Sequence, residues 1–125
     1  MSDGIVGAPV GQTPINPLWR AFFWAAAIFN FAIGLAGMLS PEATQDARIV
    51  GLLVFSFGVI YLLVARNAER YGSALWAGVI GKVGVVIMLA PAQFGPDGSA
   101  MLAAVLALDA LFAAGFLIFL LARND

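Results

Sequence analysis

Three polar residues interrupt the hydrophobic segments of this chain and could do chemistry there: Asn30, Lys82 and Asp109. Lys82 and Asp109 carry opposite charges, and no other charged residue lies so far inside a hydrophobic segment. A lone charge at the centre of a bilayer costs about 2.5–3.5 kcal/mol on the insertion scale. We therefore expect the two to pair, and the amide of Asn30, which can both donate and accept, could complete a polar cluster.

The three residues are expected at one depth. Asn30 lies nine residues before Leu39, Lys82 nine before Pro91, and Asp109 nine after Ala100. At 1.5 Å per helical residue each is about 13 Å from the outer boundary, close to the midplane. Such a cluster could simply fix the register of the helices. It could equally act as a proton or ion relay, or as a counter-ion for a ligand, and the sequence leaves both interpretations open.

The composition indicates the elements that must position these residues. The chain has 125 residues, of which 62% are hydrophobic and only 10% are charged, whereas a soluble domain is about half apolar and a quarter charged. Its segments are apolar on every face, which is typical of helices in lipid rather than of a soluble bundle. The predicted fold is all-α: an integral membrane four-helix bundle with short loops.

Composition also excludes several functional classes. The chain contains no cysteine and no histidine, so we expect no disulfide, haem or metal site and no resident cofactor, although a lipid or quinone could bind between helices. The net charge of −1, without a basic block, argues against nucleic acid as a partner. An enzyme is the least expected class, because acid–base chemistry would fall to side chains deep in lipid.

The chain divides into a flexible tail over residues 1–17 and a transmembrane domain over residues 18–125. Hydrophobic runs bounded by helix start and stop signals predict four spans. The spans are expected at about 18–39, 49–65, 74–90 and 100–122.

Capping residues predict the ends of these helices. Asn16-Pro17 should start the first helix, Ser40-Pro41-Glu42 the second, and Ser99 should cap the fourth. Tyr71-Gly72-Ser73 should form a tight turn, with Gly as a C-terminal cap and Ser as an N-terminal cap. Pro91 should end the third helix.

The distribution of arginines predicts the orientation. With the N-terminus inside, four arginines flank the inner ends of the spans and only Arg48 flanks an outer end. Positive residues favour the cytoplasmic side. Both termini are therefore expected in the cytoplasm. The four inner arginines are Arg20, Arg66, Arg70 and Arg123.

Small residues predict where helices meet, because they let backbones approach closely in lipid. The predicted packing positions are Gly34, Gly37, Gly78, Gly81, Ala103, Ala107, Ala110 and Ala114. Gly58 falls at the depth of the polar cluster and would leave room beside it. Tyr61, one turn further inward, could contact a ligand there or simply find a hydrogen-bond partner.

Three functions remain open. The small loops favour an accessory or structural subunit of a larger membrane complex. A small oligomeric transporter or channel could instead use Lys82, Asp109 and Asn30 as its pathway. A third alternative is a binder that holds an apolar ligand between helices, with the polar cluster as its anchor. The partners expected are the bilayer together with further copies of the chain or a larger complex.

In helix number, helix length and loop size, residues 18–122 resemble the small four-helix bacterial inner-membrane proteins grouped as DoxX-like. The resemblance lies in this layout, and no motif is carried over residue by residue. It implies a bacterial inner-membrane location and, because DoxX-type proteins are associated with quinone-linked oxidoreductase assemblies, an accessory role. Small multidrug transporters, by contrast, need a carboxylate in the first helix, where this chain has Asn30.

Overall fold

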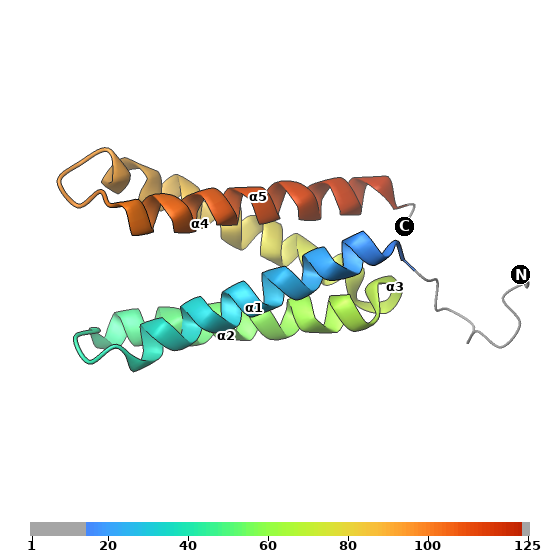
Figure 1. The fold of residues 1–125 in the computed structure, drawn as a ribbon, viewed down its shortest axis with the longest axis horizontal. Helices are drawn as coiled ribbons and strands as arrows, with labels where there is room; N and C mark the ends of the chain where they lie inside the picture. Colours follow the sequence, from blue (N-terminus) through green and yellow to red (C-terminus); the bar gives the residue numbers. More distant parts are fainter. Residues whose placement is uncertain (1–14, 124–125) are drawn as a thin grey trace, which may run out of the picture. The chain divides into compact units, whose positions relative to one another are not determined.

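The described chain is all-α. The computed structural model describes residues 15–123, so most of the tail expected over residues 1–17 lies outside the described residues. Four long helices, α1 (Pro17–Leu39), α2 (Gln45–Arg66), α4 (Leu75–Gln93) and α5 (Ala100–Ala122), account for most of this part of the chain (Figure 1). A short helix, α3 (Ala68–Tyr71), and a 3-10 turn, η1 (Gly72–Ala74), connect α2 to α4.

The helices form two compact units. The first, which ends at Gly72, contains α1, α2 and α3, and we call it the first hairpin. The second, which begins at Ser73, contains α4 and α5, and we call it the second hairpin. Within each hairpin the two long helices run antiparallel and side by side (Figure 1).

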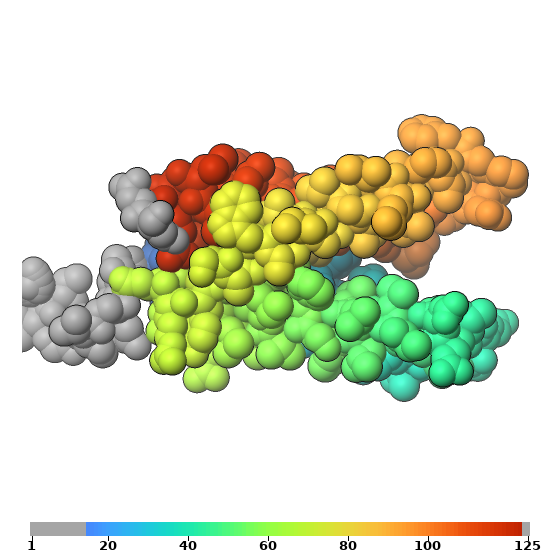
Figure 2. All heavy atoms as spheres, turned by 180° about the vertical axis from the view of Figure 1, so that it is seen from behind, coloured from blue at the N-terminus to red at the C-terminus, as the bar shows by residue number. Residues whose placement is uncertain are grey.

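Four helical stretches are long and apolar enough to cross a membrane: Pro17–Leu39, Gln45–Arg66, Ala68–Gln93 and Ala100–Ala122. Only 22–33% of the residues in their most apolar windows are buried. Many of the other large apolar side chains are exposed; on α2, the helix drawn in green in Figure 2, they are Ile49, Val50, Leu52, Leu53, Val59 and Leu63. So much exposed apolar surface requires lipid as the solvent. The chain is a multi-pass membrane protein.

Side-chain caps begin three of the long helices. The Asn16 side chain accepts a hydrogen bond from the Leu18 amide at 2.8 Å, and Pro17 follows as the first helical residue, as predicted. Ser99 accepts from the Leu102 amide at 3.0 Å, also as predicted. The second helix differs: Thr44, not Ser40, is its cap, and it accepts from the Ala47 amide at 3.1 Å. Each cap satisfies an amide that has no partner within its helix.

The predicted turn at residues 71–73 is wrong. The break lies at Asn67, whose non-helical backbone (φ −152°, ψ 83°) ends α2 and whose side chain accepts from the Arg70 amide at 3.1 Å to start α3. Gly72 has right-handed helical dihedrals, φ −58° and ψ −37°, so it is not a left-handed C-terminal cap. One asparagine serves both as the end of one helix and as the start of the next.

The predicted stop at Pro91 is also wrong, because α4 continues to Gln93. Proline removes one amide donor and crowds the carbonyl four residues back, but its own carbonyl can still accept. The Phe94 amide donates to the Pro91 carbonyl at 3.2 Å. The helix therefore ends within a turn after the proline rather than at it.

Glycines allow the α1 and α2 backbones to touch in the first hairpin. A Cβ on Gly34 would lie 2.6 Å from the Phe55 nitrogen and 2.7 Å from the Gly51 oxygen. Gly37 faces the same helix, with its Cβ position 3.3 Å from the Gly51 Cα. The packing predicted for Gly34 and Gly37 is confirmed, and Gly51 is the partner that the sequence analysis missed.

The second hairpin packs through the face of α5 that carries Asp109, as the predicted ion pair requires. Its buried residues are Leu106, Asp109, Phe112, Ala113, Phe116 and Leu120. Ala107, Ala110 and Ala114 are exposed and Ala103 is half-buried, so the alanine seam is not the face that α5 turns towards α4. On α4, Gly78 is buried as expected, but Gly81 is exposed, with nothing within 4 Å of its Cβ position. Asp109 and the aromatic residues occupy the contact instead.

Candidate functional site

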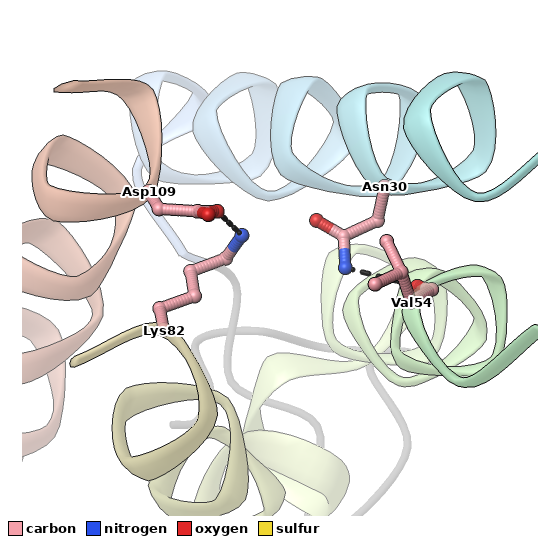
Figure 3. Close-up of polar contacts among 4 residues, drawn as sticks. All are labelled: Asn30, Val54, Lys82 and Asp109. Carbon is pink, nitrogen blue, oxygen red and sulfur yellow. Dashed lines mark hydrogen bonds and ion pairs between the residues drawn. The ribbon is translucent and has the colours of Figure 1, made fainter. Parts of the chain in front are cut away.

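Lys82 and Asp109 form a direct ion pair between α4 and α5. The Lys82 Nζ donates to Asp109 Oδ1 at 2.6 Å (Figure 3). The two side chains are only 6% and 11% exposed. A charge-assisted hydrogen bond of this length is among the stronger polar contacts a protein makes, and burial reduces its screening by water. The pair expected from the sequence is therefore present.

Aromatic rings complete the surroundings of this ion pair within the second hairpin. The Lys82 Nζ lies 5.4 Å from the centroid of the Phe112 ring, which is within the range of a cation–π contact. Phe112 in turn stacks with Phe116, at 6.3 Å between ring centroids. Phe112 follows Asp109 by three residues, so both project from the same face of α5. The sequence analysis missed Phe112, although its i+3 spacing from Asp109 could have indicated it.

Both partners lie well inside their helices. Lys82 is the eighth of the 19 residues of α4, and Asp109 is the tenth of the 23 residues of α5. Because α4 ends at Gln93, Lys82 is about 16 Å from the end of its helix, rather than the predicted 13 Å, and Asp109 is about 13 Å from the start of α5. The flexible four-carbon stem of lysine accommodates this difference in depth.

Asn30 belongs to the first hairpin, where it connects α1 to α2. Its Nδ2 donates to the carbonyl oxygen of Val54 at 3.0 Å (Figure 3). The residue is 4% exposed, and the bond satisfies a polar group in an apolar setting. No sequence signal marks a backbone carbonyl such as that of Val54 as a partner. A single cluster of Asn30 with the ion pair stays a prediction.

The space beside Gly58 is filled by protein. A Cβ on Gly58 would lie 2.8 Å from two ring carbons of Phe31 and 3.3 Å from the Ala27 oxygen. Gly58 therefore receives an aromatic ring from α1, and the room that the sequence analysis expected there is occupied. Tyr61 is 1% exposed, and its ring lies 6.4 Å from that of Phe57. Ligand contact by Tyr61 stays a prediction.

Arg48 holds the loop between α1 and α2. Its two terminal nitrogens donate to the carbonyls of Met38 at 2.8 Å and Ser40 at 3.1 Å. These carbonyls lie at the C-terminal end of α1, where cations interact favourably with the helix dipole. The sequence analysis treated Arg48 only as the single arginine of the outer flanks, so this structural role is new.

The fold and the buried ion pair define the class: a small multi-pass membrane protein whose four spanning helices form two hairpins, the second joined by a salt bridge inside the membrane. Comparison of the chain with protein-family models, with curated proteins and with solved structures finds no match.

Proposed function

We propose that this chain is an accessory subunit of a larger membrane complex, and that Lys82 and Asp109 hold its second hairpin together. The observation that carries the proposal is the 2.6 Å contact between the two charges. Of the charged side chains in the described helices, only these two lie away from the helix ends. Each neutralises the other, so neither charge is left over to attract a transported ion. Such a pair suits a structural role better than a transport pathway.

The chemistry of the side chains supports the same function. The sequence contains no histidine and no cysteine. Within residues 15–123, no group of three or more acidic side chains is placed to hold a metal ion. A subunit that serves in assembly needs no histidine, cysteine or metal site of its own, because the catalytic residues of the complex would belong to the partner.

The outward face of α5 supports docking to other helices. Ala107, Ala110 and Ala114 are exposed, and they lie about 120° around α5 from its buried face. In lipid, small residues at an exposed face allow a second helix to approach closely, which is the usual basis of helix association there. The alanine seam, which does not face α4, would thus pack α5 against a partner.

The proposed location is the bacterial inner membrane, with both termini in the cytoplasm. The four inner arginines support this orientation, and the four-helix layout, which resembles DoxX-like proteins, supports the bacterial location. The resemblance also favours a partner that acts on quinones. A lipid or quinone held at the interface with that partner would fit the apolar faces of the spans.

Native mass spectrometry tests the proposal. The tagged chain is extracted from its own membrane in mild detergent, and we expect a stoichiometric complex with a larger membrane protein. A variant with Ala107→Leu, Ala110→Leu and Ala114→Leu should lose that partner. The control is Leu108→Ala, at an exposed position of the same helix that lies at least 100° around the helix from each of the three alanines, and it should retain the partner.

Two results would count against the accessory role. A chain recovered only as a monomer or as a homo-oligomer would contradict it. A homo-oligomer in which Asp109→Asn abolishes ion flux in liposomes would favour the transporter instead, since flux would then depend on the charge of the pair.

A further inference from the structure

One end of the first hairpin carries three exposed arginines. Arg20 is the fourth residue of α1, Arg66 is the last residue of α2, and Arg70 lies in α3 just beyond. Because α1 and α2 are antiparallel, the start of α1 and the end of α2 lie at the same end of this unit, beside α3 (Figure 1). All three side chains are exposed. We call this arginine-bearing end the basic end.

Among the residues that the structure describes, no carboxylate neutralises these three guanidinium groups, because none of the three forms an ion pair with one. Arg70 lies 5.3 Å from the centroid of the Tyr71 ring, a cation–π contact that orients the group but leaves its charge in place. Glu69 is the only acidic residue of the described chain at this end of the hairpin.

The opposite end of the same hairpin is chemically different. Its one arginine, Arg48, donates to the carbonyls of Met38 and Ser40, so both of its terminal nitrogens are already engaged. Two acidic residues, Glu42 and Asp46, are exposed there. The hairpin therefore offers free guanidinium donors at only one of its two ends.

The basic end also has the setting of a membrane interface. Trp19 stacks on Phe23, with 5.9 Å between ring centroids, beside Arg20 at the start of α1. Leu18 next to them is 78% exposed, and Leu63, one turn before Arg66, is 38% exposed. Tryptophan and tyrosine favour the level of the lipid headgroups, with apolar side chains just below it. We therefore place the arginines at the depth of the headgroup phosphates.

We infer that the basic end binds the phosphate headgroups of anionic phospholipids. A guanidinium presents several N–H donors in a fixed plane that matches two phosphate oxygens, and it is weakly hydrated compared with an ammonium. A basic residue near an anionic membrane surface contributes about 1 kcal/mol. Three such residues at one end of the hairpin should therefore give it a higher affinity for anionic than for zwitterionic lipid. The inference does not depend on the accessory role.

Lipid preference can be measured directly on the full-length chain. The protein is reconstituted in nanodiscs of phosphatidylcholine alone and of an equimolar mixture with phosphatidylglycerol. We expect a higher unfolding temperature in the mixture, because a ligand that binds the folded state stabilises it. Native mass spectrometry should show phosphatidylglycerol retained in preference to phosphatidylcholine. Each single change to glutamine, at Arg20, Arg66 or Arg70, should weaken this retention about fivefold, the equivalent of about 1 kcal/mol.

Arg48→Gln is the matched control. It removes one arginine from the same hairpin but at the end where the guanidinium is engaged by carbonyls. We expect it to lower the unfolding temperature in both nanodiscs and to leave the difference between them unchanged. The triple variant Arg20→Gln, Arg66→Gln, Arg70→Gln should instead abolish the difference in unfolding temperature between the two nanodiscs.

Three outcomes would overturn the inference. The wild-type chain could show no preference for phosphatidylglycerol, a measurement that needs no variant. The single variants could retain the full preference, a result that stands even if the triple variant does not fold. Inorganic phosphate, at an ionic strength matched with chloride, could reproduce the stabilisation, which would make the site one for free phosphate rather than for lipid.

Discussion

Lys82 Nζ and Asp109 Oδ1 lie 2.6 Å apart and join α4 to α5 near the middle of both helices. The contact pairs the only two charges that lie away from the ends of the described helices. Insertion of either charge alone into lipid would be costly, whereas the neutral pair can be carried by one hairpin. The pair thus explains how this hairpin tolerates ionic side chains inside a membrane.

Because α1 and α2 approach closely at Gly34, adding one methyl group there should destabilise the protein. Gly34→Ala would place a carbon 2.6–2.7 Å from backbone atoms of α2, which cannot move aside as a side chain can. We expect a loss of about 1–3 kcal/mol in the free energy of unfolding, the usual range for overpacking. Chemical unfolding of the detergent-solubilised protein measures it.

Gly81→Ala is the matched control for that experiment. Its added carbon meets nothing within 4 Å, so the substitution should be neutral or slightly stabilising, because alanine favours helix over glycine. If Gly34→Ala and Gly81→Ala lowered the free energy of unfolding equally, the glycine contact between α1 and α2 would not be formed.

The Asn30 side chain predicts a second stability effect in the first hairpin. Asn30→Leu keeps the branched shape and the number of heavy atoms of the side chain but removes the hydrogen bond to the Val54 carbonyl. We expect the free energy of unfolding to fall by about 1 kcal/mol, within the range measured for polar contacts between membrane helices. Ser56→Ala is the control, because Ser56 is exposed and bonds only the Leu52 carbonyl of its own helix. A loss at Ser56 as large as at Asn30 would contradict the interhelical role.

The arginines predict the topology. Alkaline phosphatase fused after residue 125 should be inactive, because it would remain in the cytoplasm. The same enzyme inserted after Phe94, in the loop between α4 and α5, should be active on the opposite side. Activity of the C-terminal fusion with none from the loop would reverse the proposed orientation.

Sequence alone predicted the four helices because a long apolar run with Asn16 or Ser99 before it is a strong local signal. It also predicted the Lys82–Asp109 pair, since depth along a helix follows from counting residues. It failed at Asn67, where one residue ends one helix and begins the next, and the more usual glycine signal at Gly72 misled it. Asn67 and Gly72 both carry signals for a helix boundary, and the sequence does not show which of the two is used.

The alanine seam is a different case, because it does not form the contact between α5 and α4. Small residues indicate that helices can approach, but not which helix approaches or whether it belongs to the same chain. Asp109 and Phe112 lie on the face that α5 turns towards α4, where each charge of the ion pair avoids the cost of standing alone in lipid. For the same reason the sequence could predict that Asn30 is buried but not that it bonds to the Val54 carbonyl.

The most direct test of the account is a double-mutant cycle on the ion pair, measured as free energies of unfolding in detergent. Lys82→Ala and Asp109→Ala should each lower stability by about 2–3 kcal/mol, because each leaves an unpaired charge in an apolar site. The double variant should lose clearly less than the sum. Val83→Ala with Leu108→Ala, at neighbouring exposed positions, is the control cycle and should be additive within about 0.5 kcal/mol. Additive losses at Lys82 and Asp109 as well would show that the two side chains do not act as a pair.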